Sequence, residues 1–271
     1  MVQLFIIRLD GDGREVIMKA IYLDCFSGIS GNMLLGAFLQ GGVPLSCLKE
    51  ELQKLHLHEA YELRSSETSK QGIAAIYVEV VEENEHHAEG TQEGHSHEHH
   101  HHRSWQDIRS LIEASELSSQ VKAKSCAIFE TLAIAEGKVH HRHKEEVLFH
   151  EVGALDSIVD IVGAAICLEY LGVEKVMTSA VNTGSGFVHC AHGLMPVPAP
   201  ATAELLLGFP VYHKGAEKEL TTPTGAAFIK ALASYEENLP AAFAAHSIAY
   251  GAGTWDLPIP NVLRMYLGEL G

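Results

Sequence analysis

Apolar positions along the chain alternate between the two-residue spacing typical of strands and the three-to-four-residue spacing typical of helices. Strand-like runs cover 20–23, 61–65, 73–81, 176–180, 244–250 and 262–267, and helix-like runs cover 33–39, 48–55, 105–112, 118–139, 204–207 and 225–233. Ser46 and Ser104 stand where helix N-caps are expected. The alternation predicts a mixed α/β (α+β) fold, although the order of the strands stays open.

The most apolar helix-length segment of the chain covers residues 153–171. A helix that is apolar around its whole circumference is usually buried on most sides. We therefore predict a central helix here, with the strands and the other helices arranged around it.

Two segments fall outside this pattern. Residues 1–17 either precede a natural start at Met18 or add a hairpin strand over Leu4–Leu9. Residues 82–103 contain no large apolar side chain, so they cannot build a core, and we predict a disordered, solvated insertion in a region that otherwise extends over 18–271. Its histidines are candidate metal ligands, because imidazole suits divalent first-row metals: His86, His87, His95, His97, His99, His100, His101 and His102.

Composition narrows the function classes. The 271 residues carry 35 acidic and 19 basic side chains, a net charge of −16, so we expect no nucleic-acid partner. The five cysteines form no C-x-x-C pair, and the chain has no apolar run long enough to span a membrane. These features predict a cytoplasmic location without a membrane partner, and a homo-oligomer remains possible.

The clearest candidate for chemistry lies at the start of the apolar helix. Asp156 and Asp160 are four residues apart, so both carboxylates share one helix face, and His150 stands just before them. A carboxylate among apolar neighbours is costly unless it is paired, hydrogen-bonded or bound to metal. The alternative is structural, with His150 capping the helix and both aspartates bonded to nearby backbone.

Glycine- and hydroxyl-rich segments supply further candidates. Asp24 ends a strand and is followed by Ser27, Gly28, Ser30 and Gly31 before a helix, a favoured position for ligands in α/β sheets. Ordinary turns or caps explain such segments equally well.

A second such helix start carries Thr221, Thr222 and Thr224, and either start could hold an anion. Cys190 lies between His189 and His192, which makes these two histidines further candidate metal ligands.

Five ordered motifs resemble the LarC family, whose members insert nickel into the pincer cofactor of lactate racemase. The motifs are Tyr22–Met33, Phe149–Asp160, Pro196–Leu206, Leu220–Ala226 and Pro260–Arg264, and the family's internal His-rich insertion is matched as well. The resemblance covers nearly everything from Met18 onward. It departs at Asn32, where the family has Asp, and we expect the family's C-terminal domain associated with CTP to be missing from this chain.

The resemblance implies a substrate, cofactors and site residues. The substrate is a pyridinium bisthiocarboxylate mononucleotide, into which Ni²⁺ is inserted with Ni–S and Ni–C bonds, using CTP with Mg²⁺ or Mn²⁺. Asp24, His150, Asp156 and Asp160 are then the candidate catalytic residues. The candidate cofactor-binding residues are Ser27, Gly28, Ser30, Gly31, Thr221, Thr222, Thr224, Asn261 and Arg264.

The sequence thus predicts a nickel insertase of the lyase class. For CTP-dependent activity, we expect this insertase to need a C-terminal domain, either in the same polypeptide or in a separate one. Two alternatives belong to other classes. One is a nickel storage or delivery protein without catalysis, and the other is a metal-dependent phosphoesterase that uses the Asp/His pocket.

Overall fold

The computed structural model describes residues 17–82, 103–149, 155–190 and 193–271. The strands are β1 Met18–Asp24, β2 Tyr61–Lys70, β3 Ile73–Glu82, β4 Arg103–Ser104, β5 Leu148–Phe149, β6 Lys175–Thr178, β7 Val181–Asn182, β8 Phe187–Cys190, β9 Gly193–Pro196, β10 Val211–Tyr212, β11 Ala233–Tyr235, β12 Phe243–Ala252 and β13 Val262–Leu270. The helices are α1 Gly31–Gln40, α2 Leu45–Gln53, α3 Trp105–Ala114, α4 Ser119–His140, α5 Leu155–Leu171, α6 Pro200–Leu205 and α7 Pro223–Leu232, with a 3₁₀ turn over Lys144–Glu146.

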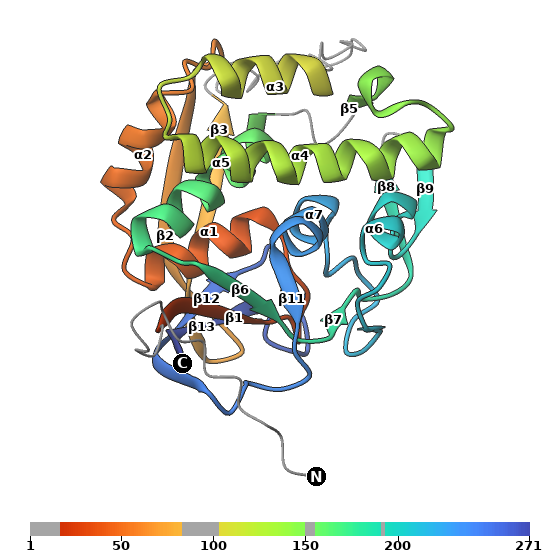
Figure 1. Ribbon diagram of the computed structural model, residues 1–271. Helices are drawn as coiled ribbons and strands as arrows, with labels where there is room; N and C mark the ends of the chain where they lie inside the picture. Colours follow the sequence, from red (N-terminus) through yellow and green to blue (C-terminus); the bar gives the residue numbers. More distant parts are fainter. Residues whose placement is uncertain (1–16, 83–102, 150–154, 191–192) are drawn as a thin grey trace, which may run out of the picture.

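A seven-stranded mixed sheet forms the base of the molecule, in the order β11-β6-β1-β13-β12-β3-β2 (Figure 1). Strand β1 lies inside the sheet, parallel to β6 on one side and antiparallel to β13 on the other. Along β1 the side chains alternate, since Ile21 and Leu23 enter the main core whereas Tyr22 packs on the opposite face. The predicted α/β class is confirmed.

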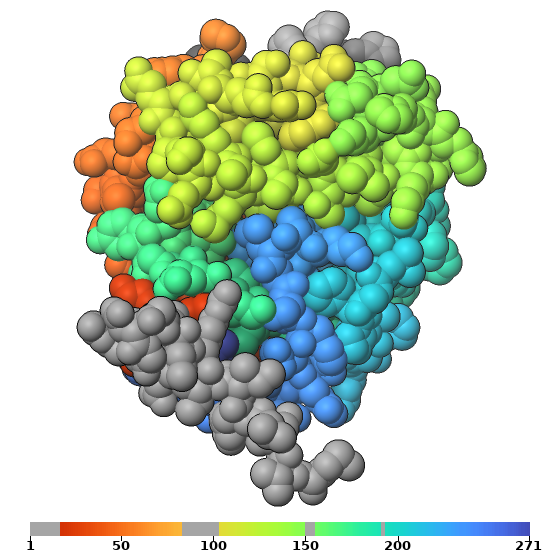
Figure 2. Space-filling model, viewed as in Figure 1, coloured from red at the N-terminus to blue at the C-terminus, as the bar shows by residue number. Residues whose placement is uncertain are grey.

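The helices lie on one side of the sheet in two layers (Figure 1). Helix α1 packs on β3 and β12, α5 packs on α1, and α4 crosses α5 and α7. Figure 2 shows residues 103–149, which include α3 and α4, spread over the outer surface of this side.

Helix α5 is the central helix that the hydropathy pattern predicts. Twelve of its residues are buried, among them Ile158, Val159 and Val162. Gly163 lies against Leu35 of α1, where an added Cβ would come within 3.0 Å of the leucine side chain. The part of the prediction that covers residues 153–154 lies outside the described residues, as do the Leu4–Leu9 hairpin strand and nearly all of the 82–103 insertion.

Two predicted helix boundaries are wrong, both next to a proline. Helix α2 begins at Leu45 with Pro44 as its N-cap, so Ser46 lies inside the first turn and caps nothing. Helix α6 begins at Pro200 and ends at Leu205, whereas the predicted helix covers 204–207. In both places the fixed φ of proline suits a helix start. The predicted cap at Ser104 is confirmed, because its hydroxyl and Asp107 form a capping box on α3.

The buried side chain of Asn182 joins the loops at one edge of this sheet. Its Nδ2 donates to the carbonyl oxygens of Phe26 and Lys214, both at 2.8 Å, and its Oδ1 accepts from the N–H groups of Gly184 and Lys214, both at 3.2 Å. Its own carbonyl accepts the hydroxyl of Thr221 at 2.9 Å. Asn182 therefore fixes the loop after β1, the loop before α7 and the segment after β7 to one another.

We expect Asn182→Ala to lower the free energy of unfolding by about 3 kcal/mol, because it strands several buried backbone groups without partners. Urea denaturation followed by circular dichroism measures the change. Asn238→Ala is the matched control, since Asn238 is exposed, and it should stay within about 0.5 kcal/mol of the parent. Equal stability of the two variants would contradict this role of Asn182.

Candidate functional site

A cavity of about 380 Å³ opens where the N-terminal ends of α1, α5 and α7 meet. We call it the three-helix cavity. Its lining combines carboxyl groups, hydroxyl groups and one amide, on residues Ser30, Gly31, Asn32, Tyr77, Val78, Glu79, Val80, Asp156, Ser157, Asp160, Glu219, Thr222, Pro223, Thr224 and Thr254.

Backbone hydrogen bonds between two loops bring the starts of α1 and α7 together. The Ile29 N–H donates to the Leu220 carbonyl at 3.0 Å, and the Thr222 N–H donates to the Ile29 carbonyl at 3.1 Å. Gly28 makes this approach possible, because it has φ +79° and an added Cβ would lie 1.9 Å from the Leu220 oxygen. The two glycine- and hydroxyl-rich segments singled out in the sequence are therefore neighbours in space.

The start of α5 approaches α1 through another glycine. A Cβ at Gly31 would lie 2.2 Å from Oδ2 of Asp160, so only the absence of a side chain lets this carboxyl group lie against the α1 backbone. Asp160 therefore enters the cavity beside the first turn of α1.

Asp156 and Asp160 both line the cavity, on one face of α5. Asp160 is half-buried, and burial together with the nearby charge of Asp156 raises its pKa well above the ordinary aspartate value. Asp156 keeps exposed surface, but the concave surroundings remove part of its water, and this burial raises its pKa as well. The Asp156 carboxylate accepts a hydrogen bond from the Ser157 N–H at 2.7 Å, which opposes that rise.

The cavity is acidic. Four carboxyl residues line it, Glu79, Asp156, Asp160 and Glu219, whereas no lysine or arginine occurs among its described lining residues. The helix starts oppose this charge, since each presents the positive end of its dipole. Ser30 precedes α1 without capping its N–H groups, while the Thr222 hydroxyl accepts from the Gly225 N–H at the start of α7.

Sequence reasoning missed several residues of this lining. Glu79 and Tyr77 come from β3, Thr254 follows β12, and Glu219 precedes the Leu220–Ala226 motif. Nothing in the local pattern of these residues points to a site. Tyr77, Glu79 and Thr254 meet because β3 and β12 are neighbours in the sheet, and Glu219 joins them from the loop before α7.

Asp24 and Arg264 lie outside the three-helix cavity. They face each other across β1 and β13 and form an ion pair, with Arg264 Nε 3.0 Å from Asp24 Oδ2. The Arg264 guanidinium lies 5.4 Å from the ring of Phe26 and 5.5 Å from that of Tyr266. The described structure therefore does not bring Asp24 together with Asp156 and Asp160 in this cavity.

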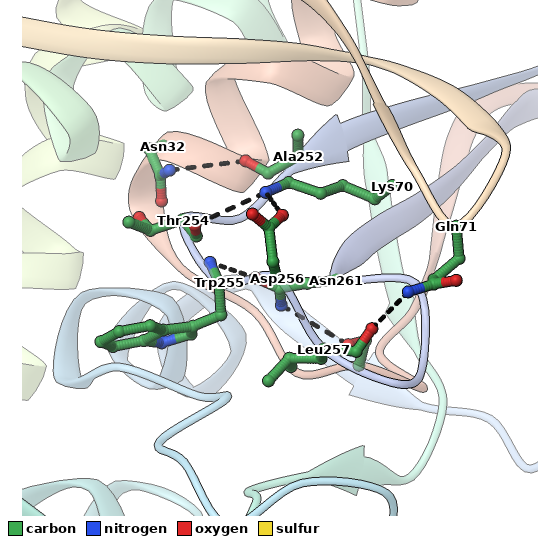
Figure 3. A network of polar contacts seen from close by, with 10 residues as sticks. Asn32, Lys70, Gln71, Ala252, Thr254, Trp255, Asp256, Leu257 and Asn261 are labelled. Atoms are coloured by element: carbon green, nitrogen blue, oxygen red, sulfur yellow. Dashed lines mark hydrogen bonds and ion pairs between the residues drawn. The ribbon is translucent and has the colours of Figure 1, made fainter.

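The remaining candidate cofactor-binding residues divide into two groups. Ser30, Gly31, Thr222 and Thr224 line the cavity. Ser27, Thr221 and Asn261 are buried behind it and connect loops, as when the Asn261 Oδ1 accepts from the Trp255 N–H at 3.0 Å (Figure 3).

The candidate metal ligands lie mostly outside the described residues: His86, His87, His95, His97, His99, His100, His101, His102 and His192, as does the candidate catalytic residue His150. His189 is described, and it lines a second cavity of about 410 Å³ together with Cys190 and His140. This cavity shares Glu219 and Pro223 with the three-helix cavity. Within the described ranges, no three His, Cys, Asp or Glu side chains are placed to hold a metal ion.

None of the helices in the described part of the chain is long and apolar enough to cross a membrane.

Comparison with known proteins identifies relatives of this chain. A protein named pyridinium-3,5-bisthiocarboxylic acid mononucleotide nickel insertion protein from Desulfitobacterium hafniense is 48% identical over 253 residues, covering 93% of this chain and 59% of the relative. Proteins of the same name from Clostridium acetobutylicum and Geobacillus kaustophilus are 48% and 46% identical, with 64% and 60% of their lengths covered. The chain thus spans about three-fifths of these relatives, and no solved structure gave a significant match.

Residues 21–270 match the family described as nickel insertion protein, which is nearly the whole chain. The resemblance seen in the five motifs is therefore confirmed by an independent match, and this chain belongs to the nickel insertion protein family.

Proposed function

We propose that this chain inserts nickel into a pyridinium bisthiocarboxylate mononucleotide and that the three-helix cavity holds the reacting end of that substrate. The observation that carries the proposal is the pair Asp156 and Asp160, which face an acidic cavity at three helix starts in a chain of the nickel insertion family. The relatives' printed name supplies the substrate.

The charges of the cavity suit both partners of the reaction. Its carboxyl groups attract a divalent cation, and oxygen ligands together with the substrate's sulfur atoms would complete the nickel coordination. The N–H groups at the start of α1 suit an anionic thiocarboxylate. The substrate itself supplies sulfur and carbon donors, so the protein does not need a closed set of ligands.

Metallation of the ring also requires a base. When nickel replaces hydrogen on a ring carbon, the C–H bond breaks, a C–Ni bond forms and a proton leaves. Asp160 suits the acceptor role, because burial and the charge of Asp156 raise its pKa well above the ordinary aspartate value and so make its carboxylate a stronger base. Asp156 lies one helical turn away and holds the cation or takes part in the same proton transfer.

Three further points remain predictions from the family resemblance. They are the lyase class, the use of CTP with Mg²⁺ or Mn²⁺, and the need for a C-terminal domain supplied by the same or a separate polypeptide. The cytoplasmic location and any homo-oligomer remain predictions as well.

We expect Asp160→Asn to slow nickel insertion by at least about a hundredfold, the usual size of a lost general base. The assay mixes the chain with a nickel salt and the pyridinium bisthiocarboxylate mononucleotide, and follows product absorbance. Arms with and without CTP, Mg²⁺ and a separately made C-terminal region test the predicted requirements.

Glu174→Gln is the matched control for this assay, because Glu174 is an exposed acid just after α5 and outside the cavity. It should insert nickel at the parent rate. Full activity of Asp160→Asn would overturn the role of Asp160, and no nickelated product in any arm would overturn the proposed function.

The raised pKa of Asp160 also predicts how stability depends on pH. The folded chain keeps this proton at pH values where the unfolded chain has lost it, so stability falls as pH rises from about 4 through the raised pKa. Asp160→Asn removes this loss. In urea titrations, the stability of the variant relative to the parent should therefore increase across that window and then level off, whereas a constant difference would contradict it.

Deleting residues 82–102 separates catalysis from nickel storage. If the histidines of this segment only gather nickel, the deletion should raise the nickel concentration needed for half-maximal insertion and leave the rate at saturating nickel unchanged. Equilibrium dialysis with ⁶³Ni and the insertion assay measure the two effects. Loss of all activity at saturating nickel would favour the storage or delivery function instead.

A further inference from the structure

An exposed tryptophan lies beside the three-helix cavity. Trp255 follows Thr254, which lines the cavity, and its side chain is 43% exposed. It belongs to the loop between β12 and β13 and extends away from the β2–β3 turn (Figure 3). Because the indole is this exposed, it contributes little to the core.

The loop that carries Trp255 is held by several contacts (Figure 3). The Gly253 N–H donates to the Asn261 carbonyl at 2.8 Å, and the buried Asn261 Oδ1 accepts from the Trp255 N–H. From the β2–β3 turn, Lys70 Nζ lies 2.7 Å from Asp256 Oδ1 and Gln71 Nε2 lies 2.6 Å from the Leu257 carbonyl. The backbone on both sides of Trp255 is therefore fixed while its ring stays accessible.

One face of the ring already attracts a cation. The ammonium group of Lys218 lies 4.6 Å from the centre of the Trp255 ring, which is the geometry of a cation–π contact. Lys218 is exposed, and its neighbour Glu219 lines the cavity just as Thr254 does. The Lys218–Trp255 pair thus joins two segments whose neighbouring residues line the cavity, and it shows that a positive charge can be accommodated on this face of the indole.

The substrate of the proposed reaction has two charged parts that match this pair. Its pyridinium ring is a flat aromatic cation, which a tryptophan face binds well. Its phosphate is an anion, and none of the described residues lining the cavity is a lysine or arginine, so the phosphate needs a cation on the rim. Lys70 is already paired with Asp256, whereas the Lys218 ammonium lies over the ring.

We propose that Trp255 binds the pyridinium ring face-on at the cavity rim and that Lys218 pairs with the phosphate of the same mononucleotide. This assignment rests on the proposed function, because it takes the substrate class from there. The ring then takes the position that the Lys218 ammonium occupies over the indole.

Tryptophan fluorescence tests the assignment without nickel. The chain has two tryptophans, and Trp105 is buried at 2% exposure, so Trp105→Phe leaves Trp255 as the sole emitter. Titration with nicotinate mononucleotide, a pyridinium mononucleotide without sulfur, should quench this emission saturably. Cytidine 5′-monophosphate has the same ribose phosphate with an uncharged base, and it should bind roughly 3- to 30-fold more weakly.

Variants of Trp255 and Lys218 separate the contribution of ring binding from that of phosphate binding. Calorimetry measures the binding affinity of each variant. Trp255→Leu should weaken nicotinate mononucleotide binding roughly 3- to 30-fold, with Trp255→Phe in between, and Trp105 emission reports whether each variant is folded. Lys218→Met should weaken the same ligand about two- to fivefold but leave N-methylnicotinate, which has no phosphate, unaffected. Lys214→Met, an exposed lysine on the same segment, is the matched control and should change neither.

The outcomes distinguish this inference from the proposed function. Absence of quenching, or equal binding of the two nucleotides, overturns the inference. So does nickel insertion by Trp255→Leu at unchanged KM. Saturable quenching in a chain that never inserts nickel would leave the ring site in place and overturn the proposed function alone.

Discussion

The arrangement of the cavity depends on one buried amide. Asn182 uses both donors and both acceptor positions of its side chain on backbone groups of three different segments. A buried amide satisfied in this way holds its partners in place, because any displacement leaves a polar group without a partner. The loops before α1 and α7 are thereby placed beside each other, and the positive ends of both helices open into the same space.

This placement has an electrostatic consequence. An acidic cavity at the sheet edge would repel an anionic substrate, and a set of helix starts without carboxylates would not attract nickel. The three-helix cavity combines the two, because the carboxyl groups of α5 and β3 line the same space as the first turn of α1. A zwitterionic ligand with a metal ion fits such a site better than a simple anion or a simple cation does.

The sequence predicts the local parts of this structure well. The burial of α5, the Ser104 cap and the proximity of Asp156 to Asp160 follow from spacing over a few residues. The same reasoning could not find Glu79, Glu219 or Thr254, because their positions depend on strand order and on loops far apart in the chain. Asp24 shows the opposite problem, since its position after a strand suggests a ligand site, but its carboxylate is paired with an arginine brought from β13.

The pairing of β1 with β13 also bears on how the site comes into being. Met18 lies opposite Leu270, so the strand made first in the sheet is completed by the strand made last. The loop that carries Trp255 and Thr254 connects β12 to β13, which pair with each other, so it takes its place in the sheet only once β13 has paired. During synthesis, the lining of the cavity therefore stays incomplete until β13 has emerged from the ribosome, even though its partner β1 is made first.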